Sequence, residues 1–175
     1  MCQQHDVYGF RQRTFGAMAE YMLWPADAIN HKVPPDVPPH HAAFIEPLAC
    51  AIHAVVRGEI KFEDVVVIAG AGPLGLGMVA AARMRNPRLL VVVDLEDRRL
   101  EVARRCGADL TLNPSKVDVV EEVLGLTEGY GCDVYIEATG HPAAVEQGLR
   151  MIRKLGTFVE FSVMREPVTV DWTII

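Results

Sequence analysis

The sequence predicts an α/β protein whose core is a doubly wound parallel β-sheet. Short, almost continuously apolar runs recur along the chain, which is typical of strands that helices cover on both faces. Stretches with helical periodicity separate these runs, and this alternation favours βαβ units with right-handed crossovers. The five expected strands are Val65–Ala69, Leu89–Val93, Leu110–Leu112, Val134–Ala138 and Thr157–Phe161.

The first forty residues differ from the rest of the chain. Prolines stand at positions 25, 34, 35, 38 and 39, within and before a Pro-Pro-Asp-Val-Pro-Pro stretch. This stretch cannot be helical, because its rings fix φ and remove backbone donors. Residues 1–40 are therefore expected to be the tail of another domain and a connector. A helical stripe of apolar residues then begins near His41 and stops near Gly58.

The turn after the first expected strand has the residue order of a dinucleotide-binding, or Rossmann, turn. Its sequence is Gly-Ala-Gly-Pro-Leu-Gly at positions 70–75, between an apolar strand and a helix. Gly70 would make the tight turn, Gly72 would let the backbone approach a pyrophosphate, and Gly75 would allow the helix to pack closely. The unpaired N–H groups at the start of this helix would favour an anion.

Asp94 ends the second apolar run, where an acid can accept hydrogen bonds from both hydroxyls of an adenosine ribose. Its carboxylate would repel a ribose 2′-phosphate, which favours NAD, although Arg98 and Arg99 lie close enough to weaken this preference. The alternative is a glycine-rich turn that only lets a helix pack on a sheet. The pairing of the turn with Asp94 argues against that alternative, so NAD binding is expected.

Four further helices are expected between the strands, at Leu74–Arg85, Asp97–Cys106, Lys116–Leu124 and Pro142–Arg150. A complete two-halved dinucleotide fold has six strands. Because only five are found, the last edge strand is expected to lie outside this chain. Residues 41–175 are accordingly expected to form the NAD-binding Rossmann domain.

Composition excludes several classes of protein. The chain has 17 Lys and Arg against 23 Asp and Glu, a formal charge of −6, and no basic cluster is long enough to follow a nucleic-acid backbone. No apolar run reaches the roughly 20 residues that cross a bilayer. The four cysteines form no Cys-x-x-Cys pair, which suits a reducing compartment. Neither nucleic acid nor a membrane is expected as a partner, and the expected location is the cytoplasm.

The chain resembles the zinc-dependent medium-chain dehydrogenases over nearly its whole length. The closest likeness is to the branch of sorbitol, erythritol or threitol, and threonine dehydrogenases. The resemblance implies that this chain is the middle and later part of a longer enzyme, with a remnant of its β-rich catalytic domain at residues 1–40. The segments that carry it are the glycine turn, Glu46-Pro47-Leu48, Asp94 to Arg99, Gly107-Ala108-Asp109 and Glu137-Ala138-Thr139-Gly140.

The resemblance assigns cofactor-binding roles to nine residues of this chain. They are Gly70, Gly72, Pro73, Leu74 and Gly75 at the pyrophosphate turn, Asp94 and Arg99 at the adenosine ribose, and Thr139 and Phe161 along the cofactor. These assignments agree with the roles that the spacing alone gives to the glycines and to Asp94.

The resemblance also implies zinc. Glu46 matches an acid that the polyol enzymes place beside a catalytic zinc, and Cys2 resembles the last of four cysteines that hold a separate structural zinc. Catalytic zinc sites commonly use three protein ligands and leave one position open, so an oxygen ligand is reasonable. Without a metal, Glu46 would only interact with a helix dipole, and Cys2 would be a surface thiol.

One histidine and the other three cysteines are expected to have structural roles only. His53 lies seven residues after Glu46, a separation of about 10 Å along a helix, and a packing role is expected for it. Cys50, Cys106 and Cys132 have apolar neighbours and are expected to be inert core thiols.

The implied reaction is zinc-assisted, NAD-dependent oxidation of a secondary alcohol of a polyol to a ketone by hydride transfer, with Glu46 in the catalytic site. The full-length protein would catalyse it, and this chain alone is expected to be inactive. The alternatives are a threonine dehydrogenase-like enzyme, a non-catalytic NAD-binding module and a zinc-free quinone reductase. The expected partners are a small-molecule alcohol or polyol and copies of the same protein, in a homodimer or homotetramer joined through the apolar residues 168–172.

Overall fold

The computed structural model describes residues 8–9, 15–26, 28–164 and 166–174. The chain divides into two compact units, 1–38 and 39–175. The described residues of the first unit form neither a helix nor a strand. Its apolar side chains Phe15, Met18, Tyr21 and Leu23 are exposed.

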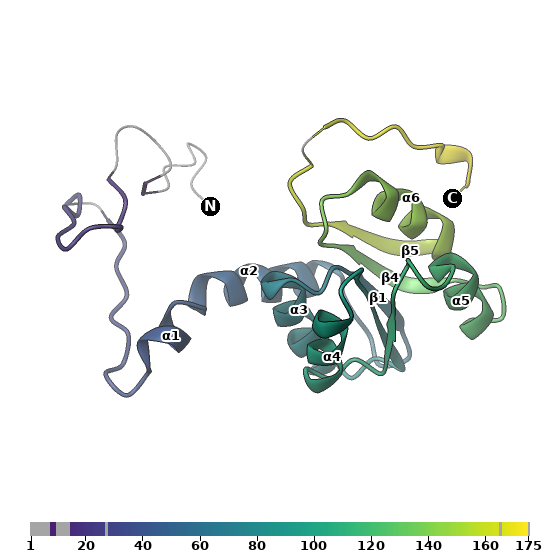
Figure 1. The fold of residues 1–175 in the computed structure, drawn as a ribbon, viewed down its shortest axis with the longest axis horizontal. Coiled ribbons are helices and arrows are strands. Elements are labelled where there is room, and N and C mark those ends of the chain that lie inside the picture. Colours follow the sequence, from purple (N-terminus) through teal and green to yellow (C-terminus); the bar gives the residue numbers. More distant parts are fainter. Residues whose placement is uncertain (1–7, 10–14, 27, 165, 175) are drawn as a thin grey trace. The chain divides into compact units, whose positions relative to one another are not determined.

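The second unit is built on a five-stranded sheet in which every neighbouring pair is parallel (Figure 1). Its strand order is β3-β2-β1-β4-β5, so the chain reverses direction across the sheet between β1 and β4. Ligands of doubly wound sheets bind outside the carboxyl ends of the strands at this reversal. The strands are β1 (Val65–Ala69), β2 (Leu89–Val93), β3 (Leu110–Leu112), β4 (Cys132–Glu137) and β5 (Ile152–Glu160).

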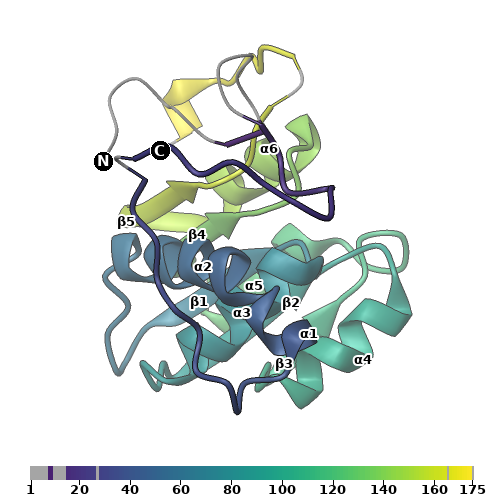
Figure 2. The ribbon, with the colours of Figure 1, turned by 90° about the vertical axis from the view of Figure 1, so that its left-hand side faces the viewer.

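In the described residues, six α-helices accompany this sheet and cover both of its faces (Figure 2). A hydrophobic core lies against each face. Val66 and Ile68 belong to a cluster with side chains of α2, α3 and α4. Val65 and Val67 belong to a second cluster with side chains of α5 and α6. Burial on both faces explains why the strands are apolar throughout. The helices are α1 (Pro39–Ala42), α2 (Ile45–Arg57), α3 (Pro73–Arg83), α4 (Asp97–Arg105), α5 (Val119–Leu126) and α6 (Pro142–Met151).

Several elements begin at other residues than the sequence predicts: α3 begins at Pro73 and β4 at Cys132, one and two residues early, and α5 and β5 differ by three and five residues. Helix α5 begins at Val119 instead of Lys116, because the Asp118 carboxylate accepts hydrogen bonds from the N–H groups of Val120 and Glu121, at 2.9 and 3.2 Å. An acid in this position is a strong N-cap.

Strand β5 begins at Ile152, five residues before the predicted Thr157, and follows α6 directly. Its first half is irregular: Leu155 has a φ of +60°, and the register with β4 shifts between Cys132 and Val134. The regular pairing runs from Val134 with Thr157 to Glu137 with Glu160. Because the first half of this edge strand is polar and strained, it does not form an apolar run, and the sequence does not predict it as part of the strand.

None of the helices in the described parts of the chain combines the length and apolar character that crossing a bilayer requires.

Candidate cofactor-binding site

The glycine turn is clamped between the ends of three neighbouring strands. Gly70 follows β1 directly, has a φ of +106°, and donates its N–H to the carbonyl of Val93 at 2.7 Å. A Cβ atom at Gly70 would lie 2.8 Å from the carbonyl oxygen of Ala138, after β4. Only glycine satisfies both the backbone conformation and this close approach, as the sequence predicts.

Gly75 lets the helix after the turn come close to the turn itself. A Cβ atom there would lie 1.9 Å from the carbonyl oxygen of Gly70, which no side chain can tolerate. Gly72 is the N-cap of α3, and a Cβ built on it meets no atom within 4 Å. The start of α3, with Pro73 in its first turn, therefore faces open space with its free N–H groups.

Asp94 ties the end of β2 to this turn. One of its carboxylate oxygens accepts a hydrogen bond from the N–H of Ala71 at 2.7 Å, and the other accepts from the N–H of Glu96 at 2.8 Å. Its side chain is only 8% exposed. The guanidinium of Arg99 lies 3.9 Å from the same carboxylate and remains largely exposed to solvent. Asp94 is thus rigidly oriented, whereas Arg99 is free to move.

A cleft of about 660 Å³ lies at the carboxyl ends of the strands, where the sheet reverses direction. It brings together five of the predicted cofactor residues, namely Gly70, Gly72, Asp94, Arg99 and Thr139. The other four do not line it. Gly75 is buried in α3, and Leu74 and Phe161 pack against the core, while Pro73 lies in the first turn of α3. The helix start, the acid and an open cleft fit a dinucleotide.

A buried glutamate, for which sequence analysis gives no role, organises the far wall of this cleft. Glu137 ends β4 and is fully buried. Its carboxylate accepts hydrogen bonds from the N–H of Thr139 at 2.8 Å, from the N–H of Gly140 at 3.1 Å and from the Thr139 hydroxyl. The one signal in the sequence was an acid at the end of an apolar strand; Asp94 follows β2 in a similar place, one residue beyond the strand.

His141 completes this wall and was also missed. The Thr139 hydroxyl oxygen accepts a hydrogen bond from the N–H of His141 at 3.0 Å. The Nδ1 atom of His141 in turn accepts from the N–H of Ala143 at 3.2 Å, which caps α6. The loop from β4 to α6 is therefore held by consecutive hydrogen bonds that begin at Glu137.

Glu160 of β5 stands in register with Glu137 of β4. Burial of the Glu160 carboxyl and the charge of Glu137 raise the pKa of Glu160 to about 7, against the effect of a hydrogen bond that Glu160 accepts from the N–H of Ser162 at 3.0 Å. The two residues are thus neighbours at the carboxyl ends of β4 and β5.

The described residues do not assemble a zinc site. They contain no group of three or more His, Cys, Asp and Glu side chains that could hold a metal ion. Glu46 lies in the first turn of α2, is exposed, and accepts a hydrogen bond from the Cys50 thiol at 3.2 Å. Cys2 lies outside the described residues. Any zinc bound near Glu46 would need its other ligands from elsewhere.

The remaining histidine and cysteines differ in part from expectation. His53 is exposed on α2, so the expected packing role is wrong. Cys132 is fully buried, and burial raises the pKa of its thiol to about 12, which makes it the inert core thiol that was expected. Cys50 and Cys106 are only partly buried. The hydrogen bond to Glu46 raises the pKa of Cys50 and disfavours its thiolate.

Comparison with known proteins connects this site to a family. A family model described as zinc-binding dehydrogenase matches residues 73–175. An erythritol/L-threitol dehydrogenase of Mycolicibacterium smegmatis is 55% identical over 175 residues, which are 100% of this chain and 48% of that protein. An L-threonine 3-dehydrogenase of Pyrococcus horikoshii is 38% identical over 172 residues, covering 98% of this chain and 48% of that protein.

A solved structure from Sinorhizobium meliloti 1021, determined with bound NADP, superposes with a TM-score of 0.76. It is 34% identical in sequence, over 81% of this chain and 43% of that one. The chain spans about half the length of the curated relatives it matches. The family model covers more than half of this chain, including α3 with its open N-terminus, Asp94 and the Glu137 loop. The chain belongs to the zinc-binding dehydrogenase family.

Proposed function

We propose that the full-length protein is an NAD-dependent dehydrogenase that oxidises a secondary alcohol of a small polyol to a ketone by hydride transfer. The observation that carries this proposal is the position of the Asp94 carboxylate. It accepts a hydrogen bond from the N–H of Ala71 at 2.7 Å, and Asp94 lines the cleft that the glycine turn also lines. The turn and the acid form one rigid unit with the chemistry of a dinucleotide site.

The chain's own residues supply the groups that would bind the cofactor. The free N–H groups at the start of α3, beyond the open Gly72, would donate hydrogen bonds to the pyrophosphate. Each carboxylate oxygen of Asp94 uses one acceptor position on the backbone and keeps another for a ribose hydroxyl. A 2′-phosphate would be repelled by this carboxylate, so NAD is the expected cofactor, with Arg99 as the group that could reduce the preference.

Bound NAD would accept a hydride from the carbon of the substrate alcohol. The residues described above would bind and orient the NAD. The start of α3 would hold its phosphates, Asp94 would hold its ribose, and the wall formed by Thr139 and His141 would enclose its opposite side. Such positioning lowers the entropic cost of the transfer.

We also propose that the full-length protein uses zinc, to which Glu46 would contribute one carboxylate. The described residues do not hold the metal, so no step is assigned to it.

The substrate class is inferred from the relatives. The relative that acts on erythritol and L-threitol is 55% identical, whereas the threonine dehydrogenase is 38% identical, and this difference supports a polyol.

We further propose a homodimer or homotetramer. Val168, Val170 and Trp172 supply apolar side chains beside the edge strand β5, and an unpaired apolar sheet edge favours association.

The test is formation of NADH by the full-length protein, given NAD and a panel of sugar alcohols together with L-threonine, with and without a zinc chelator. Turnover of a polyol that the chelator abolishes would support the whole proposal. Turnover of threonine alone would show that the substrate is threonine and not a polyol. Turnover that survives complete removal of zinc would show that the reaction does not need the metal. Binding of NADH without turnover of any compound would identify a non-catalytic NAD-binding module instead.

A further inference from the structure

Two glutamates are neighbours at the carboxyl ends of β4 and β5. Glu137 and Glu160 are register partners. Glu137 is fully buried, and Glu160 borders a groove of about 870 Å³ between β5, α6 and the segment 164–172. Among the ion pairs between described residues, none involves either glutamate. Two adjacent carboxyl groups cannot both ionise without repulsion, so such a pair tends to keep one proton.

The two carboxyl groups differ in their hydrogen bonds. Glu137 accepts from two backbone N–H groups and one hydroxyl, all from Thr139 and Gly140. Glu160 accepts a single N–H, from Ser162. Partial desolvation and the charge of Glu137 raise the pKa of Glu160 to about 7, although Glu160 is exposed at the surface, so we place the proton of the pair on Glu160.

We propose that Glu160 acts as a positioning residue for cofactor binding. Its carboxyl proton keeps the pair with Glu137 from carrying two negative charges, and so keeps the Thr139–His141 loop in place. This inference rests on the proposed NAD-binding function. The loop lines the cleft through Thr139 and His141. The N–H groups of Thr139 and Gly140 are held by Glu137, and the N–H of His141 is held by the Thr139 hydroxyl, so a disturbance of Glu137 passes to the cofactor wall.

The other polar groups around Glu160 do not replace this proton. On β4, Tyr135 is buried and its hydroxyl donates to the carbonyl of Ala144 at 2.6 Å; burial, with the nearby Glu137, Cys132 and Glu160, raises the pKa of this phenol, so it stays neutral. On α6, Glu146 and Arg150 pair with each other at 2.6 Å and are exposed.

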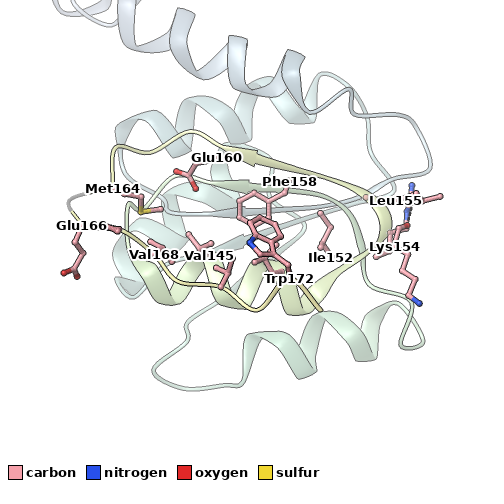
Figure 3. A pocket seen from close by; sticks show the side chains of 15 residues that line it. Val145, Ile152, Lys154, Leu155, Phe158, Glu160, Met164, Glu166, Val168 and Trp172 are labelled. Carbon is pink, nitrogen blue, oxygen red and sulfur yellow. Dashed lines mark hydrogen bonds between the residues drawn. The ribbon is translucent and has the colours of Figure 1, made fainter. Parts of the chain in front are cut away.

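Charged groups also border the groove itself (Figure 3). Figure 3 shows Glu160 beside Met164, at the opposite end of the groove from Lys154 and Leu155. Glu166 borders the groove on the segment after β5 and adds negative charge. Arg165 lies outside the described residues. Six residues along a strand separate Lys154 from Glu160 by about 20 Å, which is beyond the range of effective neutralisation in salt.

Loss of the proton therefore leaves two negative carboxylates in register. Their repulsion acts on Glu137, whose hydrogen-bond donors belong to the loop. Affinity for NADH is expected to fall about three- to tenfold between about pH 6 and about pH 8, the usual size of such indirect coupling.

The experiment measures the dissociation constant of NADH by fluorescence titration at about pH 6 and about pH 8. It compares the wild-type protein with Glu160→Gln, which keeps a hydrogen-bond donor but cannot ionise. Glu166→Gln removes the other carboxylate at the groove and serves as the matched control. The wild type and the control should lose affinity with rising pH, while Glu160→Gln should not. Equal pH dependence of the wild type and Glu160→Gln, or none in the wild type, would overturn the proposal.

A second readout separates this inference from the proposed function. The backbone amide resonance of Gly140 is followed by NMR against pH in the cofactor-free protein. A step near neutral pH that is absent in Glu160→Gln supports the positioning of the loop even if NADH fails to bind, a result that would count against the proposed function only. A Gly140 amide that does not respond to pH, or responds equally in both proteins, overturns the inference itself.

Discussion

Asp94 and Ala71 are joined by a hydrogen bond of 2.7 Å, which links the end of β2 to the glycine turn after β1. Because the Asp94 side chain is almost completely buried, the bond is shielded from water and holds the turn in one conformation. The acid that would read the ribose and the turn that would hold the pyrophosphate are therefore organised before any cofactor arrives. Preorganisation of this kind lowers the cost of binding.

Replacement of Asp94 by Asn should change cofactor preference more than it changes folding. The amide oxygen can still accept the N–H of Ala71, so we expect a loss of stability of about 1 kcal/mol. The charge that repels a 2′-phosphate disappears, and the ratio of NADPH to NADH affinity should rise about tenfold, equivalent to 1.4 kcal/mol. Fluorescence titration with both cofactors measures this ratio. Asp97→Asn, at an exposed acid paired with Lys116, is the control, and an unchanged ratio in Asp94→Asn would contradict the assigned role.

Two glycines of the turn should respond to alanine in different ways. The methyl group of Gly75→Ala would overlap the carbonyl of Gly70, and forcing α3 away should cost about 1–3 kcal/mol of stability. Gly72→Ala meets open space, so its stability should change by less than about 0.5 kcal/mol. Its methyl group would occupy the approach to the pyrophosphate, however, and NADH should bind about tenfold more weakly. Thermal unfolding and NADH titration of both variants separate the two effects, and normal NADH affinity in Gly72→Ala would be evidence against this phosphate position.

The sequence predicts strands β1 to β3 well and the edge strand β5 poorly. Strands β1, β2 and β3 begin and end at the predicted residues, because two covered faces demand unbroken apolar runs. The start of β5 was missed because Arg153, Lys154 and Gly156 interrupt its apolar pattern. The glycine turn and Asp94 were found from spacing. The pair of Glu137 and Glu160 depends on strand register, which no local pattern contains.

The same pair should make stability depend on pH. The pKa of Glu160 rises from 4.5 to about 7 on folding, so the folded state holds this proton more tightly than the unfolded chain. The resulting stabilisation is complete below the lower value and is lost as the pH rises to about 7. The midpoint of thermal unfolding should therefore fall between about pH 5 and about pH 7 in the wild type, and fall less in Glu160→Gln. Identical slopes in the two proteins would show that another group is responsible.

Thr139 should matter through its hydroxyl. This group donates to Glu137 and accepts from the N–H of His141, so Thr139→Val would leave a buried carboxylate with one donor fewer and a backbone N–H without its acceptor. The carboxylate keeps two backbone donors and the His141 N–H lies at an exposed position, so the loss of the two hydrogen bonds should cost about 1–3 kcal/mol in total. Part of this cost should appear as an NADH affinity about five- to tenfold weaker. Thr139→Ser keeps the hydroxyl and should bind NADH like the wild type. If the valine variant bound as tightly as the serine variant, the methyl group rather than the hydrogen bonds would be what Thr139 contributes to the cleft.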